Sequence, residues 1–248
     1  MTQLRLSIVL CTYNGAAYLQ PQLDSLLAQT RLPDEIVIGD DGSTDASVDM
    51  LQAFAARARD AGIEVQLLHH GENIGYVDNF SAGLRAAKGD VLFLCDQDDV
   101  WWADKLARMA ERFEQDPALL LLHGDARLVD AEGHSLDCSL FEALQMTAQE
   151  REAIHGGRAF DVVLRRSFVT GATAALRRRL VARRLATFCR TWIRIRLHSS
   201  RLLVMLALLL LIRSCLLGRV RSMVDLPRAW VGGQVRASGR RWGCCPTG

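Results

Sequence analysis

Three carboxylates lie within four residues in the segment Asp96-Gln97-Asp98-Asp99, directly after the apolar run 91–94. Carboxylates this close repel one another and lose hydration at the end of a buried strand, so the cluster is costly unless a cation or hydrogen-bond donors face it. A divalent metal that carries a phosphorylated substrate is one such cation, because hard cations prefer oxygen ligands. The alternative is a solvated acidic turn that caps a helix beginning near Trp101. The acids alone leave both interpretations open.

Two more polar clusters occur upstream, and each also follows a short apolar run. They are Thr12-Tyr13-Asn14 and Asp40-Asp41. Between the apolar runs, hydrophobic residues recur with the spacing of one buried helix face. The expected strands are at 6–11, 35–39, 65–68 and 91–94, and the expected helices are at 19–27, 48–58 and 73–87.

These strand–helix units repeat about every 27 residues, which is the length of a crossover between parallel strands. The sequence therefore predicts an α/β fold with a mainly parallel, Rossmann-like sheet flanked by helices. Ligands of such sheets bind beyond the carboxyl ends of the strands. All three polar clusters follow strand ends, so we expect them to form one site.

The two adjacent tryptophans are assigned different roles. Trp102, Leu106, Met109 and Phe113 share one helical face, which predicts core packing. Trp101 lies off that face and beside the acids, so it is expected to stack on a bound ligand.

Several longer segments carry a family resemblance. These are SIVLCTYNGAAYL, LDSLLAQT, DEIVIGDDGSTD, ENIGYVDNF and AAKGDVLFLCDQDDVWWADKL. In this order and spacing they resemble the family 2 glycosyltransferases of the GT-A fold from Leu4 to Ala175. The DQDDVW variant resembles rhamnosyltransferase-like bacterial members that build surface polysaccharides.

The resemblance implies a role for individual residues. Thr12 and Tyr13 match the loop that packs around the nucleotide base and ribose, and Asn14 completes that polar cluster. Asp41 matches the residue that hydrogen-bonds the base. Asp96 and Asp98 match the outer positions of the DxD motif.

Within that motif, Asp98 is expected to ligate Mg²⁺ or Mn²⁺ on the diphosphate, and Asp96 to contact the ribose or the metal. Such a dication would stabilise the departing diphosphate. Asp99 is either a further ligand or the cap of the following helix, and we favour the cap.

The acceptor side is less complete. Arg165-Arg166 and residues 169–173 resemble the segment that enters the acceptor half of the family site. Family members then carry a carboxylate that acts as general base. Beyond Asp161 this chain has a single acid, Asp225, so the catalytic base is unassigned.

The composition changes sharply after residue 176. Residues 1–175 hold 14 Lys and Arg against 27 Asp and Glu, whereas residues 176–248 hold 16 Arg, no Lys and one acid. The second part also carries the uncharged run 202–212, which is too short to span a membrane. No strand–helix alternation is visible there. We therefore divide the chain into a nucleotide-sugar-binding domain, 1–175, and an atypical Arg/Leu-rich segment, 176–248.

Three interpretations of this segment compete. It is a peripheral membrane element, a nucleic-acid-binding arm, or the product of a frameshift in GC-rich DNA. Aromatic residues are too sparse for nucleic-acid binding. We favour the frameshift, because an Arg-rich, Lys-free and acid-poor composition is typical of out-of-frame reading.

The expected function is metal-dependent, inverting transfer of a sugar from a nucleotide-diphosphate donor to a glycan or lipid-linked acceptor in cell-surface polysaccharide synthesis. Rhamnose from a dTDP donor is favoured over a UDP-sugar. The alternatives are a catalytically dead nucleotide-binding remnant and a membrane-associated scaffold. Cys11 and Cys95 are expected as buried thiols, and the front half shows no disulfide framework. With no N-terminal signal pattern, this favours the cytoplasm, with peripheral contact at the inner membrane face.

Overall fold

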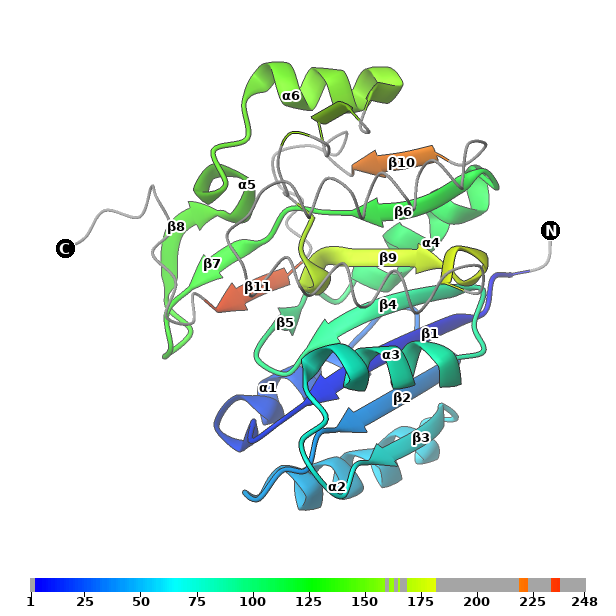
Figure 1. Cartoon of the computed structure of the whole chain (residues 1–248), viewed down its shortest axis with the longest axis vertical. Coiled ribbons are helices and arrows are strands. Elements are labelled where there is room, and N and C mark those ends of the chain that lie inside the picture. Colours follow the sequence, from blue (N-terminus) through cyan, green and yellow to red (C-terminus); the bar gives the residue numbers. More distant parts are fainter. Residues whose placement is uncertain are drawn as a thin grey trace.

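The computed structural model of the chain describes residues 3–158, 161–162, 165, 169–181, 219–222 and 233–236 (Figure 1). A seven-stranded sheet with the order β10-β6-β9-β4-β1-β2-β3 forms its centre. The four strands that the sequence predicts are present and mutually parallel. They are β1 (Leu6–Thr12), β2 (Glu35–Asp40), β3 (Glu64–His69) and β4 (Val91–Asp96). The predicted α/β fold with a mainly parallel sheet is confirmed.

Helices cover both faces of this sheet, as Figure 1 shows. The helices on one face are α1 (Ala16–Leu27), α2 (Ser47–Asp60) and α4 (Lys105–Gln115). On the other face α3 (Tyr76–Ala86) packs against β1 and β2. The inner strands are buried on both faces, which is why they read as continuous apolar runs in the sequence.

Alternate side chains of β1 pack into two separate hydrophobic cores. Ile8 and Leu10 join the core beneath α1, α2 and α4, whereas Val9 joins the core beneath α3. Helix α3 approaches the sheet closely because residue 83 is glycine. A Cβ atom at Gly83 would lie only 2.5 Å from Cγ1 of Val9.

A smaller sheet with the order β5-β11-β7-β8 lies beside the first. Its strands are β5 (Val100–Trp101), β11 (Gly233–Arg236), β7 (Arg127–Val129) and β8 (Ser135–Ser139). The helix that was expected to open near Trp101 is therefore preceded by a strand, and α4 begins at Lys105. Two short helices follow β8, and each begins with a capping box: α5 (Leu140–Ala143) and α6 (Ala148–Ala153). A π-helical turn (Ile154–Arg158) follows α6.

The chain beyond residue 173 adds strands to both sheets. A short 3₁₀ turn (Gly171–Thr173) leads into β9 (Ala174–Arg177), which lies between β4 and β6 (Leu119–His123) and is antiparallel to both. Strand β10 (Arg219–Ser222) then pairs with β6, and β11 pairs with β5 and β7.

The sequence shows no strand–helix alternation after residue 176, yet these two segments form strands that join the two sheets. The apolar run 202–212 lies outside the described residues. Within the described parts of the chain, no helix is long and apolar enough to cross a membrane.

Candidate functional site

The three polar clusters meet where β4, β1 and β2 end side by side. Cys11 in β1 pairs with Asp96 in β4 and with Gly39 in β2, so the carboxyl ends of these strands are level. The chain runs from β1 to β2 on one side, whereas β4 returns on the other side. This change of direction between β1 and β4 is the position at which open parallel sheets bind ligands. The three clusters therefore lie at one edge of the sheet, and that they form one site stays a prediction.

Gln97 bridges the gap between β1 and β4. Its Oε1 accepts a hydrogen bond from the backbone N–H of Tyr13 (2.8 Å), and its Nε2 donates to the carbonyl of Tyr13 (3.2 Å). A Cβ atom at residue 15 would lie 2.4 Å from Oε1 of Gln97, so Gly15 makes room for this contact. Sequence reasoning treated Gln97 as the variable position of the motif, because no pattern marks a side chain that bonds to a distant backbone.

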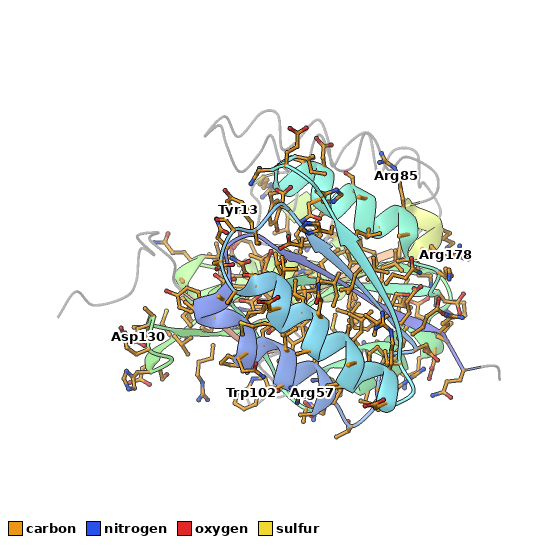
Figure 2. The ribbon with its side chains drawn as sticks, turned by 90° about the horizontal axis from the view of Figure 1, so that it is seen from below. Tyr13, Arg57, Arg85, Trp102, Asp130 and Arg178 are labelled. Atoms are coloured by element: carbon orange, nitrogen blue, oxygen red, sulfur yellow. The ribbon has the colours of Figure 1, made fainter. Side chains whose placement is uncertain are left out.

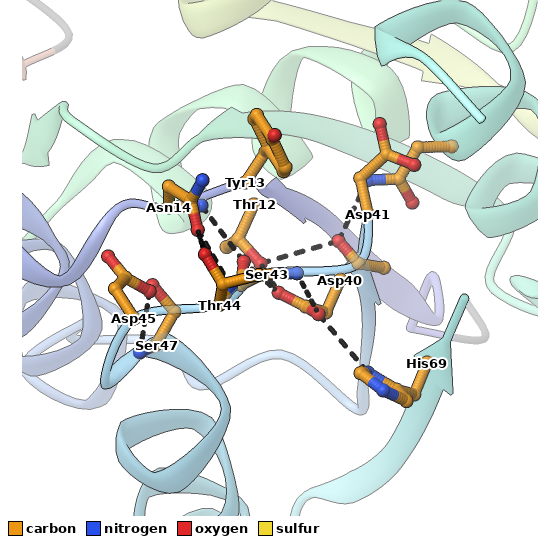
Figure 3. Close-up of polar contacts among 12 residues, drawn as sticks. Thr12, Tyr13, Asn14, Asp40, Asp41, Ser43, Thr44, Asp45, Ser47 and His69 are labelled. Atoms are coloured by element: carbon orange, nitrogen blue, oxygen red, sulfur yellow. Dashed lines mark hydrogen bonds and ion pairs between the residues drawn. The ribbon is translucent and has the colours of Figure 1, made fainter. Parts of the chain in front are cut away.

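Asp40 organises the end of β2 (Figure 3). Its Oδ1 accepts hydrogen bonds from the hydroxyls of Thr12 (3.1 Å) and Ser43 (2.5 Å). Its Oδ2 accepts one from the backbone N–H of Ser43 (3.0 Å) and lies 3.1 Å from Nδ1 of His69. Thr12, expected at the nucleotide, is 2% exposed and serves this network in the structure.

Asn14 links the loop after β1 to the loop after β2, as Figure 3 also shows. It adopts a left-handed conformation (φ 47°), which asparagine tolerates better than most residues. The side-chain Oδ1 of Asn14 accepts a hydrogen bond from the backbone N–H of Thr44 (2.8 Å). The backbone N–H of Asn14 donates a hydrogen bond to the hydroxyl of Ser43 (2.9 Å). Tyr13, between these contacts, is 46% exposed, so its ring is open to a ligand.

Asp41 holds the loop that leads into α3. Its Oδ1 accepts a hydrogen bond from the backbone N–H of Ile74 (2.7 Å), and its Oδ2 accepts one from that of Gly75 (3.0 Å). The carboxylate is 3% exposed and lies at the N-terminal end of α3, where a negative charge is favourable. Each oxygen keeps a second lone pair, so the proposed contact with a base is compatible with this role.

The acidic turn after β4 has three distinct environments. Asp96 and Asp98 are half-buried, and Oδ1 of Asp96 accepts a hydrogen bond from the hydroxyl of Tyr76 (2.8 Å). Asp99 is 3% exposed. Helix α4 begins after Asp104, so the expectation that Asp99 caps this helix was wrong.

Lys105 is a charged residue that the sequence analysis did not single out. It is 1% exposed, and its Nζ donates a hydrogen bond to the carbonyl of Ala172 (2.8 Å). Burial lowers its pKa to about 7, while the charges of Cys95, Asp99 and Asp96 act in the opposite direction. Burial also raises the pKa of the Cys95 thiol well above its usual value. The two carboxylates that act on Lys105, Asp96 and Asp99, both belong to the acidic turn.

The burial expected for the two tryptophans is reversed. Trp101 is 4% exposed, its ring packs near Phe93 (6.3 Å between centroids), and Nζ of Lys105 lies 3.5 Å from its ring centroid. Trp101 is therefore a core residue and not a free platform for a sugar. Trp102, assigned to the core, is 39% exposed and lies near Arg127. Figure 2 places Trp102 on the side of the molecule where α1 and α2 lie, apart from Tyr13. Because residues 100–101 form a strand, the helical spacing that put Trp102 inside does not apply.

The segment 169–173 reaches the same edge from the other side. Gly124, just after β6, donates its N–H to the carbonyl of Thr173 (3.2 Å). A Cβ atom at Gly171 would lie 3.6 Å from the hydroxyl of Tyr76 and 3.7 Å from Oδ2 of Asp96. The predicted acceptor-side segment therefore lies against the acidic turn. Of the Arg165-Arg166 pair, Arg166 lies outside the described residues.

Asp125, which directly follows Gly124, is a further carboxylate near this edge. Burial raises its pKa. Its Oδ1 accepts hydrogen bonds from the backbone N–H groups of Ala126 and Phe141, both at 2.9 Å. These contacts hold the start of α5, so we assign Asp125 to structure.

The donor set of the acidic turn fits a hard dication in part. Asp96 and Asp98 offer carboxylate oxygens, which suit Mg²⁺ or Mn²⁺, and a bound diphosphate would supply further oxygens. Among the described residues, three ligand atoms converge within 4.8 Å only at Asp130, Glu132 and His134. That group lies in the exposed turn between β7 and β8, away from the sheet edge, and an exposed cluster of this kind is common without a metal.

Comparison with known proteins adds the family. The family model described as glycosyl transferase family 2 matches residues 7–183, beyond the boundary expected at 175. An uncharacterized glycosyltransferase of Nostoc sp. is 34% identical over 134 residues, which are 54% of this chain and 40% of that relative. The uncharacterized glycosyltransferase YwdF of Bacillus subtilis is 30% identical over 129 residues, 52% of this chain and 44% of YwdF. The chain thus matches less than half of the length of these relatives.

Solved structures share the fold. S. aureus TarS in complex with UDP-GlcNAc superposes with a TM-score of 0.64 at 18% identity, over 96% of this chain and 60% of that one. The mannosyltransferase PcManGT from Pyrobaculum calidifontis, in complex with GDP-Man and Mn²⁺, gives a TM-score of 0.59 at 19% identity, over 98% and 59% of the two chains. The TM-scores show a common fold, and at these identities the likeness shows the fold alone.

Proposed function

The chain belongs to glycosyltransferase family 2, and from this we propose that it binds a nucleotide-diphosphate sugar at the edge formed by β4, β1 and β2. The observation that carries the proposal is the direct link between the polar turns. Gln97 ties the acidic turn to Tyr13, and Asn14 ties the same loop to the turn after β2. One ligand can therefore contact all three clusters at once.

The nucleotide would lie over the loops after β1 and β2. The exposed ring of Tyr13 is suited to stacking on a base, and Asp41 lies at the base of the adjoining loop. Thr12 and Asn14 would act mainly by holding these loops in place. The structures of TarS with UDP-GlcNAc and of PcManGT with GDP-Man support a nucleotide-sugar as the class of ligand.

The diphosphate would lie against the acidic turn. Asp98 and Asp96 would hold Mg²⁺ or Mn²⁺ there, and the metal would supply Lewis-acid stabilisation of the leaving diphosphate. The Mn²⁺ in the PcManGT complex supports a metal-dependent donor site. The acceptor would approach along the segment 169–173, which lies beside Asp96.

We propose inverting transfer, in which an acceptor hydroxyl attacks the anomeric carbon in line with the diphosphate. Such a reaction requires a general base. No residue in the described parts of the chain is assigned to that role. The DQDDVW resemblance supports rhamnose from a dTDP donor, and with it an acceptor that is a glycan or a lipid-linked glycan of the cell surface. Lipid-linked acceptors would bring the protein to the inner membrane face from the cytoplasm.

A nucleotide-binding remnant is the second candidate function. Two observations favour it. The polar residues expected at the donor site lie at one edge of the sheet, whereas no general base is assigned. The chain also matches only 40% and 44% of the length of the two relatives from Nostoc and Bacillus subtilis. Both candidates predict nucleotide binding, and only the enzyme predicts turnover.

Calorimetric titration with UDP and dTDP, each with and without Mn²⁺, tests the donor site. We expect Mn²⁺-dependent binding that is lost in Asp98→Ala. The matched control is Asp60→Ala, which removes an exposed carboxylate at the far end of α2. Asp60→Ala should bind as the unmodified protein does.

Turnover is then measured as release of nucleoside diphosphate from the bound donor. Binding with turnover supports the transferase, and binding without turnover supports the remnant. Absence of binding to both nucleotides would refute the proposed donor site.

A further inference from the structure

Lys105 is the first residue of α4 and is 1% exposed. Lysine is almost never fully buried without partners, because moving an ammonium group out of water is costly. Its Nζ contacts the carbonyl of Ala172 and the ring of Trp101, which lies two residues after Asp99. A buried cation behind a proposed cation site is unexpected unless its charge has a role there.

Two contacts favour the charged form of this lysine. Nζ donates a hydrogen bond to the carbonyl of Ala172 at 2.8 Å, and an ammonium donor strengthens such a bond. Nζ also lies 3.5 Å from the centroid of the Trp101 ring, within the range of a cation–π contact. A neutral amine would lose the electrostatic part of both interactions.

The anions that act on Lys105 belong to the acidic turn. They are Asp99, which is 3% exposed, and Asp96. Three carboxylates in four residues would otherwise leave a high negative charge at the end of β4. The positive charge of protonated Lys105 offsets part of it whether or not a metal is bound.

We propose that Lys105 is a positioning residue that makes the acidic turn selective for a metal–nucleotide complex over the bare metal ion. Its charge lowers the affinity of Asp96 and Asp98 for a free dication, so that tight binding requires the oxygens of the diphosphate. Its bond to Ala172 holds the acceptor-side segment against the same turn. This inference rests on the proposed donor site.

The test compares Lys105→Met with the unmodified protein in Mn²⁺ titrations followed by electron paramagnetic resonance, with and without UDP or dTDP. Methionine keeps most of the buried volume and removes the charge. Loss of one unit charge beside a doubly charged ion, taken at a separation of about 10 Å with an effective dielectric constant of about 20, predicts roughly 200-fold tighter binding of Mn²⁺ alone. The gain in Mn²⁺ affinity on adding nucleotide should shrink by a similar factor.

The direction of the change in Mn²⁺ affinity distinguishes an electrostatic role of Lys105 from a purely structural one. If Lys105 only supports the fold, its loss disturbs the acidic turn, and Mn²⁺ affinity falls or stays constant. That result would overturn the proposal. The double variant Lys105→Met with Asp99→Asn removes one charge of each sign, so it should return Mn²⁺ affinity toward that of the unmodified protein. It also guards against misfolding of the single variant, because it leaves no uncompensated carboxylate at residue 99.

The unmodified protein decides the proposed function independently. If it binds neither nucleotide with Mn²⁺, the donor site and this inference both fail. If it binds nucleotide with Mn²⁺ and Lys105→Met does not bind free Mn²⁺ more tightly, only the inference about Lys105 fails.

Discussion

Replacement of Asp41 by asparagine tests how the donor edge is held together. The carboxylate accepts one hydrogen bond from Ile74 and one from Gly75, both through backbone N–H groups. Asparagine keeps one carbonyl oxygen and presents an NH₂ group to the other donor. One charge-assisted hydrogen bond is lost, and a largely buried N–H is left facing a donor. The loop leading to Tyr76 should loosen as a result.

The expected loss in the free energy of unfolding is about 2–4 kcal/mol. Loss of a hydrogen bond to a charged group contributes about 1.5–3 kcal/mol, and an unsatisfied buried donor contributes about 1–3 kcal/mol, reduced by relaxation of the loop. Urea denaturation followed by tryptophan fluorescence measures this loss, with an unchanged slope as evidence that the unfolding reaction is the same. Because unfolding is measured without nucleotide, the result is independent of any contact between Asp41 and a base.

Asp49→Asn is the matched control, since it alters an exposed carboxylate in the first turn of α2. Its effect should stay within about 0.5 kcal/mol, as for most surface substitutions. If Asp41→Asn is equally mild, the two backbone contacts do not anchor the loop, and our account of this edge is wrong.

Three other substitutions probe separate parts of the structure. Tyr76→Phe removes the hydroxyl that donates to Asp96, so Mn²⁺-dependent nucleotide binding should weaken about five- to tenfold in calorimetry while the unfolding midpoint changes little. Arg177→Ala removes hydrogen-bond donors to the carbonyls of Phe113 and Leu119, so it should lower the free energy of unfolding by about 2–3 kcal/mol in urea denaturation. The control is Arg178→Ala at the exposed neighbouring residue, which should lower it by less than about 0.5 kcal/mol. Burial lowers the pKa of His123 to about 3. Below a pH of about 6.5 the unfolded chain therefore binds a proton that the folded chain does not. The free energy of unfolding consequently falls as the pH drops toward 3. His123→Phe should therefore lose about 2 kcal/mol less between pH 7.5 and pH 5, and equal losses in both proteins would contradict this assignment.

The parallel half of the fold follows from the sequence because its strands are buried on both faces. A strand such as Val91–Asp96 has apolar side chains at every position from Val91 to Cys95, so it is marked by composition alone. The polar residues at the strand ends could be grouped correctly, since parallel strands bring their carboxyl ends to one edge. The register of β1 against β4, which places Cys11 level with Asp96, is known only from the structure.

The contacts that hold the site together could not be read in the same way. Gln97, Tyr76 and Lys105 each bond to a group that is distant in the chain, and no periodicity marks such a contact. The tryptophan assignment failed because a two-residue strand, Val100–Trp101, interrupts the helical spacing. That strand forms through pairing with residues 233–234, far away in the sequence.

The charge break at residue 176 does not coincide with a break in the fold. Strand β9 continues to Arg177 and lies between β4 and β6, so the central sheet requires residues on both sides of the break. The family match likewise extends to residue 183. A frameshift is therefore expected only after β9 and after the end of the family match at residue 183.

The proposed frameshift would therefore lie after about codon 183 and before the codon at which family members encode the acceptor-side base. We expect one of the other two reading frames beyond that codon to encode an acidic strand–helix continuation that includes a carboxylate in a His-Asp-Trp-like stretch. Inspection of the gene sequence decides the matter. If neither frame contains such a continuation, the Arg-rich segment is native, and β10 and β11 are then strands of a C-terminal region that evolved with this donor domain.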